Sequence, residues 1–477
     1  MKTTLFACAL LFALVACSHP SHQTGQTAKY AALFSVDSGK PIGLILTTYS
    51  TTLIANGMDQ TQVRVFVVDS AGREIRSAQM PIQISIRGDA KVIAVPNGSS
   101  LEFKGSEEGS STWESNLKGG ECRLVFVAGT RPDKIRLQIK AENLWPASHE
   151  IHTLPADVKK MEPTPAQLAY KARKGEKVIG ADVSFLPQIE SRGMKYLENG
   201  VEKDALEILK NNGHNYIRLR LFVNPENERG YSPFQGFCGL EKTLMMAIRV
   251  KQAGMKLLLN FHYSDTWADP QKQFKPLLWE NIEFAALKDS VRSYTRNVLL
   301  AFKAQGTLPD MVQVGNEINH GMLWPEGHIS NLDQLAELLK AGFEGVRSVD
   351  RSMLTMAHVA LGGQKEESVF WFDNMIARGV EFDIIGLSYY PQYHGMLDDL
   401  AANALFVSER YHKDVNVVEY ATYHKEISEI LFDLPNQRGQ GHFSWELLGR
   451  FFDRRSGEPS ALLKEYNELN KKYLLSE

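Results

Sequence analysis

A run of short apolar segments that alternate with helical patterns begins at Val178, and it constrains the fold more than any other feature. The apolar segments have the length of buried strands, and the stretches between them place apolar residues at helical spacing. Eight strands that alternate with helices over about 270 residues match one closed (β/α)8 barrel. We therefore predict a TIM barrel over residues 178–477. Its predicted strands are Val178–Phe185, Asn215–Phe222, Lys256–Tyr263, Met311–Ile318, Leu354–Ala360, Asp383–Tyr390, Val415–Thr422 and His442–Glu446.

The predicted helices of this barrel are uneven in length. The pattern is weakest at the end of the barrel, because the seventh helix is confined to Ile427–Leu434 and the eighth strand is short. In a barrel of this kind, functional side chains lie at the C-terminal ends of the strands. The clearest helical patterns are Glu202–Asn211, Leu240–Ala253, Ala285–Ala304 and Leu332–Val346.

Residues 40–155 carry a different pattern, in which apolar and polar residues alternate, as in Ile135 to Lys140. This period of two predicts strands with one buried face, and their short spacing predicts an all-β sandwich. The segment resembles bacterial immunoglobulin-like domains. A carbohydrate-binding module would need a row of exposed aromatic residues, whereas only Phe103 and Trp113 are available, so a spacer or rigid support is the favoured role. Residues 156–177 are predicted to be a linker.

The N-terminus is predicted to be a targeting segment, to be set aside from the fold. Lys2 precedes the apolar run Leu5–Ala16, which is too short to span a bilayer, and Leu14 to Cys17 resembles a bacterial lipobox. We expect a lipoprotein signal peptide at residues 1–17, lipidation of Cys17 and a tether at residues 18–39. A plain secretory signal is the alternative. Either reading predicts export, and lipidation predicts an anchor in the bacterial outer membrane or at the cell surface.

Charge and cysteine usage exclude several functions. The formal net charge is −3, with 53 basic and 56 acidic residues, so no nucleic-acid partner is expected. Of the four cysteines, Cys122 and Cys238 would remain in the folded domains, where buried thiols are expected instead of a disulfide. The sequence has no CxxC or HExxH spacing, and we predict no catalytic metal.

Two glutamates end two of the predicted apolar strands: Glu317 in Met311–Gly327, and Glu419 in Val415–Glu419. Retaining hydrolysis of a glycosidic bond needs one protonated carboxyl to serve the leaving oxygen and one carboxylate to attack the anomeric carbon. We assign Glu317 as the acid and Glu419 as the nucleophile. Each alone could be an ordinary solvated residue at a strand end; the pairing favours catalysis.

Other strand ends carry groups suited to sugars, which need hydrogen bonds for their hydroxyls and aromatic rings for their C–H faces. The third strand leads into a polar and aromatic cluster at Asn260–Pro270, although His262 or Trp267 alone could be structural. Arg218 and Arg220 lie on one face of the second strand, where Glu419 is the expected partner. Trp445 offers a stacking surface at the eighth strand.

Six strings together resemble glycoside hydrolase family 53, the endo-β-1,4-galactanases: GADVSFLPQIE, NYIRLRLFVNP, LLLNFHYSDTWADP, VQVGNEINHGMLWP, DIIGLSYYP and VVEYA. The resemblance covers about residues 178–446. It implies a barrel of the retaining clan with acid/base Glu317 and nucleophile Glu419, and no cofactor. It also implies substrate contacts at Asp182, Arg220, His262, Asp265, Asn316 and Trp445, with Asn316 facing the sugar 2-hydroxyl.

The sequence departs from the family between the seventh and eighth strands. Family members usually have a longer segment there, in bacteria often with a calcium-binding loop, whereas only about twenty residues separate Glu419 from Gly441 here. Ser444 also replaces the usual tyrosine before the tryptophan. These departures argue against calcium and predict a groove with fewer distant sugar contacts.

The leading hypothesis is thus an exported, monomeric retaining hydrolase of internal β-1,4 bonds in galactan and arabinogalactan, attached to a membrane only through a lipid anchor. A second hypothesis keeps the barrel and the catalytic pair but changes the substrate to another β-linked plant polysaccharide or an oligosaccharide. A third is a non-catalytic glycan-binding lipoprotein. Retention of both carboxylates argues against the third.

Overall fold

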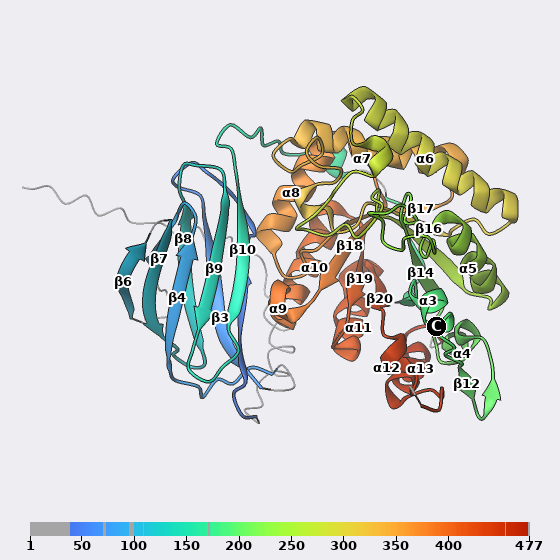
Figure 1. Cartoon of the computed structure of the whole chain (residues 1–477), viewed down its shortest axis with the longest axis horizontal. Coiled ribbons are helices and arrows are strands. Elements are labelled where there is room, and N and C mark those ends of the chain that lie inside the picture. The colour runs from blue at the N-terminus through green and yellow to red at the C-terminus, as the bar shows by residue number, and fades with distance from the viewer. Residues whose placement is uncertain are drawn as a thin grey trace, which may run out of the picture.

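The computed structural model describes residues 39–69, 73–94, 100–107, 109–169, 172–453 and 455–475. A β-sandwich and a helix-covered barrel lie side by side, with β10 of the sandwich facing the barrel (Figure 1). The predicted signal peptide, Cys17 and the tether up to residue 38 lie outside the described residues. In the part of the chain that is described, no helix is both long and apolar enough to cross a membrane.

The N-terminal domain consists of two sheets with strand orders β1-β3-β8-β5 and β2-β10-β9-β4-β7-β6. Alternation along the strands gives each sheet one face toward the shared core: Ile135, Leu137 and Ile139 are buried, while Arg136 and Gln138 between them are exposed. The predicted all-β sandwich is therefore confirmed. Its strands are β1 Gly43–Thr48, β2 Thr52–Ile54, β3 Gln60–Val68, β4 Pro81–Arg87, β5 Ala90–Ala94, β6 Leu101–Glu107, β7 Ser110–Asn116, β8 Glu121–Ala128, β9 Lys134–Lys140 and β10 Ala147–Leu154.

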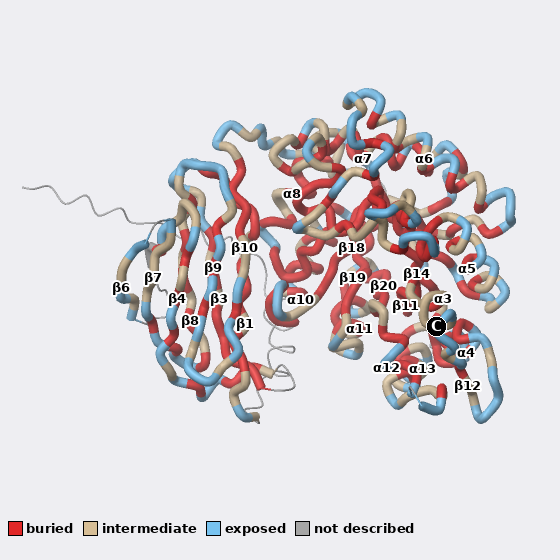
Figure 2. The backbone as a smooth tube through the Cα atoms, in the orientation of Figure 1, coloured by how far each residue is buried: buried red, intermediate tan, exposed pale blue. Residues whose placement is uncertain are grey.

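The second domain is a closed barrel of eight parallel strands, in which β11 pairs with β20 to complete the circle. The strands are buried along almost their whole length, because helices cover one face and the other fills the barrel (Figure 2). The predicted TIM barrel is confirmed. Its strands are β11 Val178–Asp182, β14 Tyr216–Leu221, β15 Lys256–Phe261, β16 Met311–Val314, β17 Leu354–Val359, β18 Ile384–Tyr389, β19 Asp414–Tyr420 and β20 Gly439–Trp445.

Helices and short elements surround the barrel. The four clearest predicted helices are all present with similar ends, and the seventh is α11, which begins three residues earlier than expected. Strands β12 Leu197–Glu198 and β13 Val201–Glu202 form a hairpin. The helices are α2 Pro165–Leu168, α3 Leu186–Glu190, α4 Ala205–Asn211, α5 Leu240–Gln252, η2 Leu277–Trp279, α6 Phe284–Gln305, η3 Ile318–His320, α7 Leu332–Val349, α8 Lys365–Ala377, α9 Pro391–His394, α10 Leu397–Tyr411, α11 His424–Phe432, η4 Pro435–Gln437, α12 Leu448–Phe451 and α13 Ala461–Tyr473.

An apolar layer inside the barrel forms the floor of the site. Each of the eight strands contributes one buried residue to it, so the barrel interior is packed there and closed to water. Above this layer, toward the C-terminal ends of the strands, the inward side chains become polar. The layer consists of Val178, Tyr216, Leu258, Met311, Met356, Ile384, Val418 and Phe443.

Cys122 lies in the sandwich and Cys238 in the barrel domain, and both are buried. This agrees with the buried thiols expected from the sequence. Burial raises the pKa of the Cys238 thiol to about 11, so it stays protonated and unreactive at neutral pH.

Candidate active site

A cavity of 280 Å³ opens at the C-terminal ends of the barrel strands. Charged, amide and aromatic side chains converge on it, as the strand-end pattern predicted. The lining residues are Asp182, Arg218, Arg220, His262, Trp267, Ala268, Asp269, Lys272, Asn316, Glu317, Glu419 and Trp445.

Glu317 reaches this cavity because the backbone leaves the extended conformation at the end of β16. Gly315 has φ 81° and Glu317 has φ 49°, both in the left-handed region, so Glu317 lies just beyond the strand instead of within it. The predicted strand therefore ends four residues early, at Val314. A left-handed conformation is uncommon for a residue other than glycine, and it turns the glutamate into the site.

A hydrogen-bond chain orients the Glu317 carboxyl group. Ser388 Oγ donates to Glu317 Oε1 at 2.6 Å, and His358 Nε2 lies 2.8 Å from the same serine oxygen. His358 Nδ1 accepts from the Glu317 backbone N–H at 3.3 Å and from Gln313 Nε2 at 2.9 Å. Since Nδ1 accepts, the imidazole proton belongs on Nε2, which donates to Ser388. The chain occupies Oε1 and leaves Oε2 to carry a transferable proton.

Glu419 faces the same cavity from β19, where a β-bulge changes the register. Leu387 pairs with Val417 but Ser388 pairs with Glu419, so Val418 is an extra residue. Because of the bulge, Val418 joins the apolar layer while Glu419, the next residue, also faces the barrel interior.

Two donors hold the Glu419 carboxylate. Arg218 Nη1 donates to Oε2 at 3.2 Å, and the Tyr390 hydroxyl donates to Oε1 at 3.0 Å. Burial raises the pKa of Glu419, and the Arg218 guanidinium and the Tyr390 hydrogen bond oppose that rise. Both oxygens of Glu419 thus accept hydrogen bonds that favour the ionised form.

The two glutamates are close but differ in their surroundings. A carboxylate oxygen of Glu317 lies within 4.8 Å of one of Glu419. Burial and the negative charge of Glu419 raise the pKa of Glu317 well above its ordinary value. Glu419 has an arginine beside it, whereas the side-chain donor to Glu317 is the neutral Ser388. Environments that separate two carboxyl pKa values suit one proton donor and one ionised nucleophile.

The two arginines of β14 have different partners. Arg218 contacts Glu419, Asp182 at 3.0 Å and the Asn316 Oδ1 at 2.8 Å. Arg220, predicted to contact substrate, lines the cavity but pairs with Glu446 at 2.6 Å. Its guanidinium lies 4.1 Å from the Phe185 ring centroid and 4.3 Å from that of Trp267. Arg218, which was absent from the predicted substrate contacts, is therefore the arginine that holds the nucleophile candidate.

Most other predicted substrate contacts come together in the cavity. Asp182, His262, Asn316 and Trp445 all line it, from four different strand ends. Burial and the charges of Arg218 and Arg220 lower the pKa of His262 well below its ordinary value, so its ring is neutral.

Asp265, also a predicted substrate contact, lies outside the lining of the cavity. Its Oδ1 accepts the Asn224 N–H at 2.9 Å, and its Oδ2 accepts from Asn227 at 2.6 Å and from the Leu277 N–H at 2.9 Å. It joins two loops and is not among the lining residues of the cavity. Asp269, four residues later, lines the cavity instead.

Several residues that shape the site were not singled out from the sequence: Ser388, His358, Tyr390, Asp269 and Lys272. Ser388 and Tyr390 stand in the string DIIGLSYYP, but nothing in their spacing indicates which glutamate each would contact. His358 is inside β17 and Asp269 in a loop. Barrel closure brings them together.

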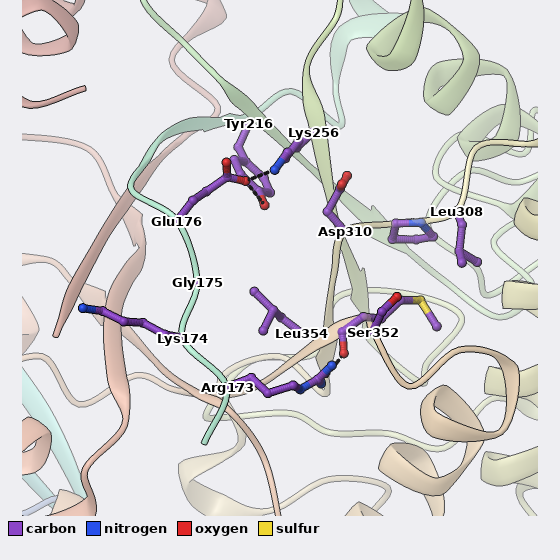
Figure 3. A pocket seen from close by; sticks show the side chains of 12 residues that line it. Arg173, Lys174, Gly175, Glu176, Tyr216, Lys256, Leu308, Asp310, Ser352 and Leu354 are labelled. Atoms are coloured by element: carbon purple, nitrogen blue, oxygen red, sulfur yellow. Dashed lines mark hydrogen bonds and ion pairs between the residues drawn. The ribbon is translucent and has the colours of Figure 1, made fainter. Parts of the chain in front are cut away.

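A larger hollow of 740 Å³ lies at the opposite end of the barrel, around the N-terminal ends of β14, β15 and β17. Figure 3 shows Glu176 reaching toward Tyr216 and Lys256 there; the Tyr216 hydroxyl donates to Glu176 at 2.9 Å. The apolar layer separates this hollow from the glutamate pair. Glu176 pairs with Lys256 inside the hollow, and Arg173 and Asp310 pair with Asp383 and Lys251 beside it. The hollow contains neither glutamate of the pair, so it is not the candidate active site.

Among the described residues, the one group of three potential metal ligands is Glu317, His358 and Glu419. Both ring nitrogens of His358 already take part in hydrogen bonds. The arrangement therefore fits an acid and a nucleophile better than a metal site. That the chain binds no calcium elsewhere stays a prediction.

A closed barrel with two buried carboxyl groups facing each other across one cavity defines a (β/α)8 glycoside hydrolase. More specifically, the chain belongs to glycosyl hydrolase family 53, whose sequence profile matches residues 178–446. Galactanases of this family act without a cofactor, in line with the expectation from the sequence.

Individual proteins support the same assignment. A protein of Niallia circulans is 40% identical over 311 residues, which are 56% of this chain and 83% of that protein. Arabinogalactan endo-β-1,4-galactanase A of Aspergillus niger is 36% identical over 249 residues, 50% of this chain and 69% of the enzyme. The solved family 53 catalytic domain of Ignisphaera aggregans has a TM-score of 0.58 and 32% identity, covering 64% of this chain and 98% of its own.

The N-terminal domain has a separate relationship. Residues 44–150 match the profile of glycoside hydrolase family 2 C-terminal domain 5. This match agrees with the predicted immunoglobulin-like sandwich. The family 53 match does not extend into this domain.

Proposed function

We propose that the protein is an exported retaining endo-β-1,4-galactanase that cleaves galactan and type I arabinogalactan by double displacement. The observation that carries the proposal is the glutamate pair, whose carboxylate oxygens approach within 4.8 Å. Retaining enzymes have carboxyl groups about 5 Å apart, whereas inverting enzymes leave about 6.5–9.5 Å for a water molecule. The choice of galactan is supported by relatives such as the Aspergillus niger galactanase.

In the first step, a Glu419 oxygen attacks the anomeric carbon while the glycosidic bond breaks. Glu317 gives its proton, carried on Oε2, to the leaving oxygen. In the second step, Glu317 takes a proton from water, the resulting hydroxide attacks the anomeric carbon, and the bond to Glu419 breaks. The pKa of Glu317 falls once Glu419 is covalently occupied, because the negative charge beside it is gone.

Substrate contacts are proposed for Asp182, His262, Asn316 and Trp445, with Trp445 as a stacking surface. Asn316 is fixed by Arg218 at Oδ1 and donates from Nδ2 to the Ala268 carbonyl at 2.9 Å, which leaves one amide N–H for a sugar 2-hydroxyl. A hydrogen bond at that hydroxyl strengthens in the transition state. Asp265 is proposed to shape the loop that carries Asp269.

Azide rescue tests the two roles separately. Glu419→Ala should lose hydrolysis and regain partial turnover with azide, which replaces the nucleophile and gives the inverted glycosyl azide. Glu317→Ala should still form the intermediate from substrates with activated leaving groups, and azide should then give the retained anomer. The same anomer from both variants would contradict the assignment.

A substrate panel tests the specificity. Purified protein should release a ladder of oligosaccharides from galactan and little from mannan or xylan. Preference for another β-linked polysaccharide would keep the mechanism and replace the substrate. If no polysaccharide in the panel released sugar, a non-catalytic binding protein would be favoured instead.

Export with lipidation at Cys17 is part of the proposal and is supported by the lipobox-like residues at 14–17. Expression with labelled palmitate should label the membrane-bound protein, and Cys17→Ser should abolish the label. A labelled Cys17→Ser variant would contradict lipidation at this residue.

A further inference from the structure

We propose that the β-sandwich forms one wall of the site that binds the leaving-group sugars, so that it takes part in substrate recognition. This inference rests on the acid and nucleophile roles proposed above. A cavity of 620 Å³ lies between the sandwich and the barrel. It shares Asp269 and Glu317 with the catalytic cavity, so the two cavities meet at the proposed acid.

The position of the shared residues identifies which part of the substrate would enter. Glu317 protonates the oxygen of the departing sugar, so that sugar lies on the Glu317 side of the scissile bond. The interdomain cavity contains Glu317 but neither Glu419 nor Trp445, which line the catalytic cavity only. The sugar that becomes bound to Glu419 therefore occupies the catalytic cavity, and the leaving sugars extend between the domains.

The sandwich contributes polar groups to this cavity from two neighbouring strands. Arg136 on β9 and Glu150 on β10 are cross-strand partners, and Arg136 Nε donates to Glu150 at 2.7 Å. The Nη groups of the guanidinium can donate to sugar hydroxyls, and the Arg136 side chain is 57% exposed. An arginine paired with a glutamate adds no net charge, which suits a neutral chain of sugars.

The barrel supplies complementary groups across the cavity. Tyr393 in α9 is 52% exposed and offers a ring to the C–H face of a sugar. Gln364 is only 1% exposed; its Nε2 donates to the Tyr393 carbonyl at 2.6 Å. Its Oε1 has no hydrogen-bond partner among the described residues. A buried acceptor without a partner at the cavity wall is available to a ligand hydroxyl.

The wall is held in place by a buried contact between the domains. Glu367 on α8, 2% exposed, accepts from the Thr51 N–H at 2.6 Å and from the Thr51 and Thr52 hydroxyls at 2.6 and 2.8 Å. The rings of His152 and His320 also lie with centroids 4.1 Å apart across the interface. A fixed wall costs less ordering on binding than a mobile domain would.

Arg136→Ala in the full-length enzyme tests the inference, with Lys140→Ala as the matched control. Lys140 is an exposed cation on the same face of β9 and is not among the lining residues. We would measure kcat/KM on β-1,4-galactotetraose, whose leaving sugars need this cavity, and on a nitrophenyl β-1,4-galactobioside, whose leaving group is a phenol. For Arg136→Ala, the ratio of the first value to the second should fall about tenfold, the effect of one charge-assisted hydrogen bond.

Lys140→Ala should leave the ratio unchanged, and Glu150→Gln, which weakens the arginine's support, should lower it in the same direction. An unchanged ratio in both Arg136→Ala and Glu150→Gln, with an active wild-type enzyme, would overturn the inference and leave the proposed function intact. A wild-type enzyme inactive on both substrates would instead refute the proposed function together with this inference.

Discussion

Removal of the Ser388 hydroxyl should change the pH dependence of catalysis in a defined direction. Ser388 Oγ donates to Glu317 Oε1 at 2.6 Å, and this hydrogen bond lowers the pKa of a carboxyl group that burial and Glu419 raise. In Ser388→Ala the opposing contribution is lost, so the pKa of Glu317 should rise further. The Glu317 carboxyl group would also lose its side-chain route to His358, although the His358 ring would still accept the Glu317 backbone N–H.

The size of the shift follows from the kind of hydrogen bond. A hydrogen bond to a charged group contributes about 1.5–3 kcal/mol, and one pKa unit corresponds to about 1.4 kcal/mol. The neutral carboxyl keeps part of the interaction, so we expect a rise of about 1 unit. The alkaline limb of kcat/KM, which reports loss of the acid's proton in the free enzyme, should move up by the same amount.

The assay is kcat/KM on a galacto-oligosaccharide across the pH range for the wild type, Ser388→Ala and Ser388→Thr. Threonine keeps the hydroxyl and should return the limb toward the wild-type position. Ser428→Ala is the control, because Ser428 is also a buried serine bonded to a histidine ring, at 2.7 Å from His442, but lies in α11. An alkaline limb that stayed in place or moved down in Ser388→Ala would refute the reasoning.

Three further predictions concern the nucleophile, the interface and calcium. Arg218→Met should raise the pKa of Glu419 and so move the acid limb of the rate profile to higher pH. It should also lower the melting temperature, because the buried carboxylates of Asp182 and Glu419 lose their cation. An unmoved acid limb would contradict the assignment of Arg218 as the partner of Glu419. Glu367→Ala should lower the free energy of unfolding by about 2–3 kcal/mol, because it leaves the Thr51 and Thr52 donors unsatisfied. The melting temperature should fall in Glu367→Ala and fall less in Glu367→Gln. Equal falls in both variants would argue against an ionised acceptor. A strong calcium chelator should change neither the melting temperature nor the activity on galactan. A melting temperature lowered by several degrees, or a loss of activity that added calcium restores, would disprove the predicted absence of the metal.

The sequence by itself determined the class of fold and the two central carboxyl groups. Alternation of apolar strands and helical stretches is a local, periodic signal, and eight repeats of it leave few topologies besides a closed barrel. Glu317 and Glu419 follow apolar strands, and parallel strands bring their C-terminal ends to one face. Both glutamates therefore meet in one cavity, as expected.

The tertiary structure alone decided which side chains touch. Arg218 and Arg220 lie two residues apart on one strand, yet barrel closure places the first at Glu419 and the second at Glu446. The bulge at Val418 sets the direction of Glu419, although strict alternation would send these two neighbours to opposite faces.

The role of the sandwich was also beyond the sequence. Its pattern predicted a support, but the contact of Thr51 with Glu367 joins residues 316 positions apart, and it brings Arg136 to a cavity that Glu317 also lines. The physical reason is the range of the interactions. Periodicity and burial are written locally along the chain, whereas hydrogen-bond partners depend on strand register and domain docking, which involve distant segments.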